Sequence, residues 1–144
     1  MDTFDLELAF YNKLVALSQP DFYTAQPDEV IEEDDLANNK WLRRGWVMSN
    51  DPYTAGFGDG VYTRVEGIYQ IDLKVPRRTD YALERLKKAS DELVDHFFAN
   101  KRGVTVTENA TSAHIVRRPN QRYMGKRGHH LYEIIEVDYY VEIQ

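Results

Sequence analysis

The spacing of apolar residues predicts an amphipathic helix near the N-terminus. An apolar stripe over residues 3–17 is formed by Phe4, Leu8, Tyr11 and Val15 and widened by Phe10, Leu14 and Leu17. These steps of three and four residues place the side chains on one helical face. Asp2 or Thr3 can cap the helix, Asp5 and Glu7 suit its positive end, and Pro20 limits its extension.

A second amphipathic helix is predicted after residue 80. Its stripe consists of Ala82, Leu86, Ala89, Leu93 and Phe97, with Val94 and Phe98 beside it. Thr79 or Asp80 is expected to be the N-cap, and Lys101, Arg102 and Gly103 to form a basic last turn with a glycine C-cap.

The clearest strand pattern runs from Gly67 to Val75. Apolar and polar residues alternate there, with Tyr69, Ile71, Leu73 and Val75 on one face and Gln70, Asp72 and Lys74 on the other, until Pro76 ends the run. We expect the first face to lie in the core and the second to face water or another subunit. A one-residue slip in register would exchange the two faces, so this strand fixes the sheet.

Four further strands are predicted. A strand from Trp41 places Leu42, Trp46 and Met48 opposite Val47, two short strands cover residues 104–108 and 113–116, and the final strand spans 131–143. Residues 135, 137, 139, 141 and 143 of this last strand alternate as Ile, Val, Tyr, Val and Ile, and a terminal strand of this length often needs partners beyond its own sheet. The order of elements predicts one α+β domain over residues 1–144, with two amphipathic helices packed on a mainly antiparallel sheet.

Three segments are predicted to be loops. Residues 19–40 hold two prolines and the acidic run Glu32-Glu33-Asp34-Asp35, residues 49–64 are rich in glycine, and residues 117–129 are basic. The glycines of the second segment lie between strand patterns rather than between a strand and a helix, which argues against a phosphate-binding loop.

Composition narrows the possible functions. The chain has no cysteine, which excludes disulfides and thiolate chemistry and suits a reducing cytoplasm. No apolar run approaches the roughly 20 residues that span a bilayer, so we expect a soluble protein with no membrane contact. Residues 1–40 carry ten acidic and two basic residues, a net charge of −8, and the remainder carries +2. Tight binding to nucleic acid would therefore need a confined basic patch.

Candidate chemical groups are few. The run from Glu32 to Asp35 offers carboxylates to a divalent cation, and His129 and His130 offer imidazoles, but adjacent residues do not converge on one ion without a scaffold. His96 and His114 have no neighbouring nucleophile or paired carboxylate. We therefore predict no catalytic, metal or cofactor site.

The basic segment is the best candidate binding surface in the sequence. Within eleven residues that contain no acid, it holds the five cations Arg117, Arg118, Arg122, Lys126 and Arg127. Two interpretations remain open: contact with an acidic subunit or passing nucleic acid, and a solvated loop that only aids solubility.

The order of these motifs resembles the tail terminator, or tail completion, proteins of long-tailed bacteriophages. The resemblance lies in Trp41-Leu-Arg-Arg, a glycine-rich loop, the strand Gly67-Ile-Tyr-Gln-Ile-Asp72 through Pro76, and the amphipathic helix before Gly103. It covers nearly the whole chain. The acidic stretch 27–40 and the basic segment 117–129 depart from the family pattern.

This resemblance implies a structural role in the virion, reached by assembly in the host cytoplasm. A homohexameric ring would cap the tail tube protein, stop tube growth and present a surface to the head-side connector or neck proteins and, in a sheathed tail, to a sheath-terminating protein. Genome DNA would pass through the lumen without specific binding. The glycine-rich loop would contact the tube or a neighbouring subunit through Pro52, Tyr53, Phe57, Asp59, Tyr62 and Arg64.

Three other functions remain open from sequence. A head-to-tail connector or head-closure subunit would also be small and ring-forming. A metal-dependent hydrolase or nuclease would use the acidic run with His129 or His130. A small adaptor would pair a sheet edge with a peptide.

Overall fold

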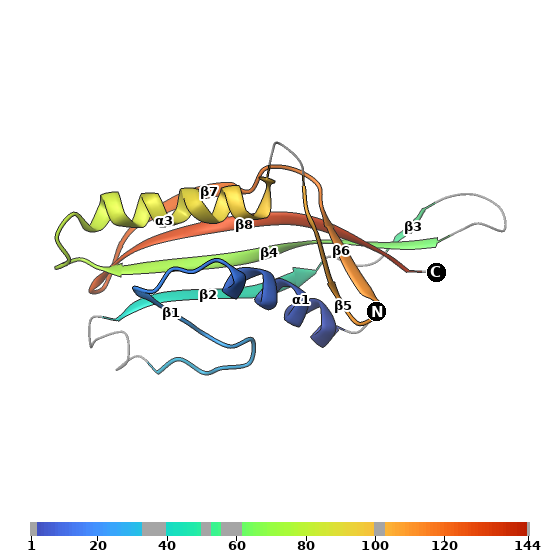
Figure 1. Ribbon diagram of the computed structural model, residues 1–144, viewed down its shortest axis with the longest axis horizontal. Coiled ribbons are helices and arrows are strands. Elements are labelled where there is room, and N and C mark those ends of the chain that lie inside the picture. The colour runs from blue at the N-terminus through green and yellow to red at the C-terminus, as the bar shows by residue number, and fades with distance from the viewer. Residues whose placement is uncertain (1–2, 33–39, 50–52, 56–61, 100–102, 144) are drawn as a thin grey trace.

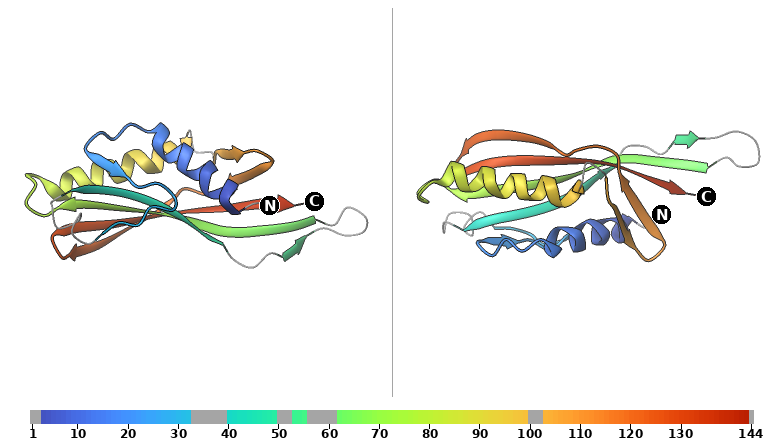
Figure 2. Two further views of the ribbon diagram at one scale, coloured as in Figure 1. Left: turned by 90° about the horizontal axis from the view of Figure 1, so that it is seen from below. Right: turned by 45° about the horizontal axis from the view of Figure 1, so that its top comes forward.

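A computed structural model describes residues 3–32, 40–49, 53–55, 62–99 and 103–143 (Figure 1). In these residues a long, twisted sheet carries two helices on one of its faces (Figure 2). The elements in chain order are α1 Thr3–Ala16, β1 Phe22–Thr24, β2 Trp41–Ser49, β3 Tyr53–Ala55, β4 Tyr62–Pro76, α3 Ala82–Phe97, β5 Thr105–Glu108, β6 Thr111–Ile115, β7 Asn120–Arg127 and β8 His130–Ile143.

The sheet is organised around β4 and β8. Its main path is β1-β2-β4-β8-β6-β5, with β3 paired to β4 and β7 paired to β8 outside that path. The β4–β8 ladder is antiparallel from Thr63 opposite Ile143 to Pro76 opposite His130. Only the β1–β2 pair is parallel among the described strands. The α+β class with a mainly antiparallel sheet is therefore confirmed.

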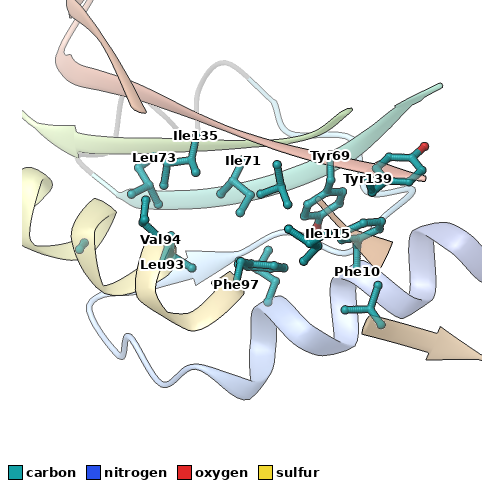
Figure 3. Packing of buried hydrophobic residues seen from close by; sticks show 14 of the residues in the cluster. Phe10, Tyr69, Ile71, Leu73, Leu93, Val94, Phe97, Ile115, Ile135 and Tyr139 are labelled. Atoms are coloured by element: carbon teal, nitrogen blue, oxygen red, sulfur yellow. The ribbon is translucent and has the colours of Figure 1, made fainter. Parts of the chain in front are cut away.

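The core lies between this sheet and the helices, as the alternation in β4 predicts. Tyr69, Ile71, Leu73 and Val75 are at most 1% exposed, and the facing β8 residues Ile135, Val137 and Tyr139 are equally buried. Phe10 of α1 stacks on Tyr69 with ring centroids 4.5 Å apart, next to Phe97 of α3 (Figure 3). Gly45 of β2 permits this packing, because a Cβ there would lie 2.0 Å from the Tyr69 hydroxyl oxygen.

The helix α1 forms where it is predicted, but its predicted buried face is partly wrong. Phe4 is 56% exposed and Val15 40% exposed, whereas the residues buried along α1 are Leu6, Ala9, Phe10 and Leu14. Two apolar stripes lie side by side on this helix, and both have helical spacing. The contacts of α1 with β2, β5 and β6 select the stripe that begins at Leu6.

The helix α3 is confirmed, but both of its predicted caps are wrong. Its N-cap is Tyr81, which has a left-handed backbone with φ of 58° and makes no capping hydrogen bond through its side chain. The helix ends at Phe97, and the Phe98 N–H donates to the Val94 carbonyl at 3.0 Å. Gly103 serves a different purpose, since a Cβ there would lie 1.8 Å from the Ile115 carbonyl oxygen.

Each of the three predicted loops contains a strand. Residues 19–40 include β1, where Phe22 is buried, and residues 49–64 include β3, which pairs with the start of β4. The basic segment 117–129 contains the eight-residue strand β7, which pairs with β8 and has a bulge between Tyr123 and Gly125. These strands were missed because they are short or lie at a sheet edge, where few apolar residues are required.

Candidate interaction surfaces

One face of the sheet, formed by β2, β4 and β8, carries no helix. The ladder registers place Trp46, Gln70 and Glu136 in one row across β2, β4 and β8 and Arg44, Asp72 and Ile134 in another. We call this the helix-free face. Met48 is 46% exposed on it, while Ile134 is only 6% exposed, so polar and apolar side chains are mixed.

Charges on the helix-free face are largely paired with one another. Three ion pairs join arginines to acidic residues of β8: Arg64 to Glu142 at 3.2 Å, Arg117 to Asp138 at 3.1 Å and Arg122 to Glu136 at 2.7 Å. The Arg64 guanidinium also lies 4.4 Å from the centre of the Tyr140 ring. The pairs leave this face with a mixed potential rather than a field of one sign.

Asp72 is the most enclosed acid on the helix-free face. It is 7% exposed, and its Oδ1 accepts a hydrogen bond from Gln70 Nε2 at 3.1 Å. Burial raises the pKa of Asp72, although hydrogen bonds from Gln70 and Tyr132 oppose that shift. Burial and the neighbouring Asp72 also raise the pKa of Tyr132. This face is thus packed by its own side chains, without any helix over it.

The five predicted cations of the basic segment fall into two groups. Arg117, Arg118 and Arg122 pair with acids from other elements, with Arg118 3.8 Å from Asp95 of α3. A shallow hollow of about 630 Å³ lies beside them and is lined by residues 117–121 and Asp138. Lys126 and Arg127 at the far end of β7 are exposed and have no ion-pair partner in the described part of the chain. The segment is therefore not a uniformly free cationic loop.

Only part of the predicted contact loop lies within the described residues. Pro52, Phe57 and Asp59 lie outside the described residues, and Tyr53 and Tyr62 lie in β3 and β4. Arg64 is opposite Tyr53 in the β3–β4 ladder and reaches Glu142 on β8. The structure thus brings Arg64 onto the helix-free face together with Arg117 and Arg122.

The histidines and acids of the described residues do not come together as a metal site. No group of three or more His, Asp or Glu side chains has metal-binding geometry in that part of the chain. His130 is buried, with its Nε2 2.9 Å from the Lys40 carbonyl, whereas His129 is exposed. The residues from Glu33 to Asp35 lie outside the described residues. Burial lowers the pKa of His130 and of His96, whose Nε2 is 2.6 Å from the Lys13 carbonyl.

Two buried charges were not singled out by sequence reasoning. Arg43 is 4% exposed and donates to Thr24 Oγ1 at 2.7 Å, to the Leu17 carbonyl at 3.0 Å and to Gln19 Oε1 at 2.9 Å, which attaches the segment before β2 to the sheet. Glu133 is fully buried and forms a salt bridge with Lys87 of α3. A charge at a core position of an alternating strand is the signal that points to both.

Comparisons with known proteins support the fold and no more. No protein-family model matches the chain, and no curated protein matches it. A solved structure whose name states no function matches with a TM-score of 0.66 at 14% identity, covering 100% of this chain and 98% of the other. In the described residues no helix is both long and apolar enough to cross a membrane. The comparisons thus place the chain in a known fold without naming its family.

Proposed function

We propose that the protein is a tail terminator that caps the end of a bacteriophage tail tube as a ring. The observation that carries this proposal is the position of the motif Gly67–Pro76. It forms most of the central strand β4, with one row of side chains packed against the helices and the other row on the helix-free face. A strand in this position holds the helix-free face in place, while the loops at its ends remain available for contacts.

The helix-free face has the properties that a surface lining a DNA passage needs. Three of its arginines, Arg64, Arg117 and Arg122, are held by Glu142, Asp138 and Glu136, which reduces the number of cations that can bind phosphates. A mixed potential lets genome DNA pass without being retained. We assign this face to the lumen side of the ring.

The capping action itself is mechanical. The ring would dock on the last ring of tube protein, and the capped end would offer no site for another tube ring. The other end would present a surface to the head-side connector. The hairpin of β3 and β4 extends past the helix-covered body and is the element best placed to reach the tube (Figure 1).

The test is tube growth in the presence of the purified protein. Tail tube protein of the same virus is polymerised with and without it, and tube lengths are measured by electron microscopy. The proposal expects shorter tubes with a ring at one end. Tubes of unchanged length, with no bound ring, would reject it. A Gly56–Gly60 deletion is expected to remain folded by circular dichroism and to leave tube lengths uncontrolled.

A further inference from the structure

Two opposite edges of the sheet lie at the same level of the molecule. The ladder registers connect one row of residues across five strands: Tyr23 of β1, Leu42 of β2, Lys74 of β4, Tyr132 of β8 and Gly125 of β7. In that row β1 and β7 are the outermost strands. They therefore face away from each other and cannot meet within one molecule.

The β7 edge carries a cluster of cations. Lys126 and Arg127 end this strand, and Arg77 and Arg78 follow β4 next to the β7–β8 turn, where the Arg77 N–H donates to the His129 carbonyl at 2.8 Å. All four side chains are exposed. We call these four residues the basic corner. It is separate from the arginines that are paired on the helix-free face.

The β1 edge carries acids. Residues 25–32, which follow β1, run outside β2 on the side away from β4 (Figures 1 and 2). The Tyr23 hydroxyl donates to Glu29 at 2.7 Å, which holds this segment against β1. Asp28 and Glu32 are exposed and have no ion-pair partner among the residues that the structure places. We call Asp28, Glu29 and Glu32 the acidic edge.

The β7 edge is open but is not suited to uncontrolled strand pairing. Among the described strands β7 pairs with β8 alone, and an added Cβ at Gly125 would meet no described atom within 4 Å. Its bulge and its terminal cations are features that deter edge-to-edge aggregation. Such an edge favours a partner that is chosen by charge.

A second copy of this chain has the complementary surface. A two-fold contact through either edge would bring like charges together, whereas a head-to-tail contact joins the basic corner to the acidic edge. A head-to-tail contact leaves one free edge of each kind on every dimer. It therefore repeats, and it closes into a ring if the rotation between copies allows.

We propose that the protein self-associates head to tail, with the basic corner of one copy docked on the acidic edge of the next. This contact deepens the proposed function, on which its closure into a ring rests. The pairing of copies itself rests only on the two edges and their charges.

The test is a charge exchange between the edges, read as mass in solution by sedimentation. Lys126→Glu/Arg127→Glu changes the basic corner from four positive charges to a net charge of zero, because Arg77 and Arg78 remain. Asp28→Lys/Glu32→Lys changes the acidic edge from three negative charges to a net charge of +1. Each variant alone is expected to associate about tenfold or more weakly than the native chain at low salt. An equal mixture of the two is expected to recover association of unlike variants, because the unaltered acidic edge of the first then meets the unaltered basic corner of the second. Added salt should weaken association of the native chain and of the mixture.

The control is Lys88→Glu/Arg118→Glu, which makes the same change in net charge at exposed positions away from the basic corner and should associate like the native chain. A native chain that stays monomeric at every concentration and salt, variants that associate as it does, or a mixture that recovers nothing would each overturn the proposal. Binding of a DNA duplex to the basic corner of a native chain that remains monomeric would also overturn it.

The tube-growth assay separates this inference from the proposed function. Native rings that leave tube lengths unchanged would reject the tail role and retain the head-to-tail contact. Capping by Lys126→Glu/Arg127→Glu at the native level would reject the contact and retain the tail role.

Discussion

The two faces of β4 and β8 differ sharply although they belong to the same strands. On the helix-covered face, Ile71 and Ile135 are fully buried. On the helix-free face, one residue further along each strand, Asp72 and Glu136 are tied by hydrogen bonds and ion pairs to their neighbours. The alternation along each strand thus gives one face an apolar core and the other a surface of mostly polar side chains.

This difference separates two kinds of residue in the motif Gly67–Pro76. The apolar residues of its helix-covered face, Tyr69, Ile71, Leu73 and Val75, pack in the core between the sheet and the helices, and their loss should unfold the protein. Its polar residues are paired across the sheet surface, and their loss should leave the fold largely intact. The same short motif therefore specifies both a core and a surface.

The largest difference in stability is expected between substitutions of two isoleucines of β4. Ile71→Ala on the helix-covered face is expected to lower the free energy of unfolding by about 2–5 kcal/mol, because it leaves a cavity in the core. Ile68→Ala on the helix-free face, where the side chain is half-buried, should cost about 1 kcal/mol or less. Urea denaturation measures both. Equal losses would show that the two faces are equally packed.

The next largest loss of stability is expected at Glu133, the acid of β8 on the helix-covered face. Lys87→Ala removes the salt-bridge partner of the fully buried Glu133 and is expected to cost about 1.5–3 kcal/mol. Lys88→Ala, at the exposed neighbouring position, should cost little. The double variant Lys87→Met/Glu133→Leu should recover most of the loss, since an apolar pair often replaces a buried ion pair without penalty. A double variant no more stable than Lys87→Ala would contradict this explanation.

A pH series tests the enclosed acid on the helix-free face. Because burial raises the pKa of Asp72 in the folded protein, the unfolded chain releases this proton first as pH rises above the ordinary value of 3.8. The contribution of Asp72 to stability is therefore present at low pH and is lost as pH rises through the raised folded pKa. The stability of Asp72→Asn relative to the native chain should thus increase across this window, as measured by denaturation at each pH.

Asp80→Asn is the control for the pH series. The Asp80 side chain is exposed in the turn before α3, so this variant removes a carboxylate without disturbing a buried position. A difference between Asp72→Asn and the native chain that does not change with pH would mean that Asp72 is not enclosed in solution.

The smallest effects are expected at the surface ion pairs. Arg118→Gln breaks a 3.8 Å contact between two well-exposed side chains and should change stability by about 0.5 kcal/mol or less. Arg122→Gln breaks a 2.7 Å contact with the less exposed Glu136 and should cost somewhat more, up to about 1 kcal/mol. Chemical denaturation at low and high salt measures both. A larger loss at Arg118 than at Arg122 would reverse the expected order.

Elements with strong periodicity were predictable from sequence. The alternation in β4 and β8 gives both their faces, and the stripe from Ala82 to Phe97 gives α3 because each of its members meets the core. On α1 the spacing located the helix but did not distinguish the stripe of Phe4 from that of Leu6, since only contacts with other elements separate them.

Edge strands were not predictable in the same way. In β1 only Phe22 needs to be buried, and β7 holds its place through backbone pairing with β8, so charged residues can fill it. The five cations of the basic segment were identified from sequence, but their partners were not. Asp95, Asp138 and Glu136 come from other elements, and only the fold brings them to Arg118, Arg117 and Arg122.

Electron microscopy of the protein mixed with tail tube protein tests the central claim most directly. The account predicts a ring of this protein at one end of each tube and tubes that stop growing once the ring is bound. Tubes that grow to the same lengths as without the protein, with free ends and the protein remaining unbound in solution, would contradict it.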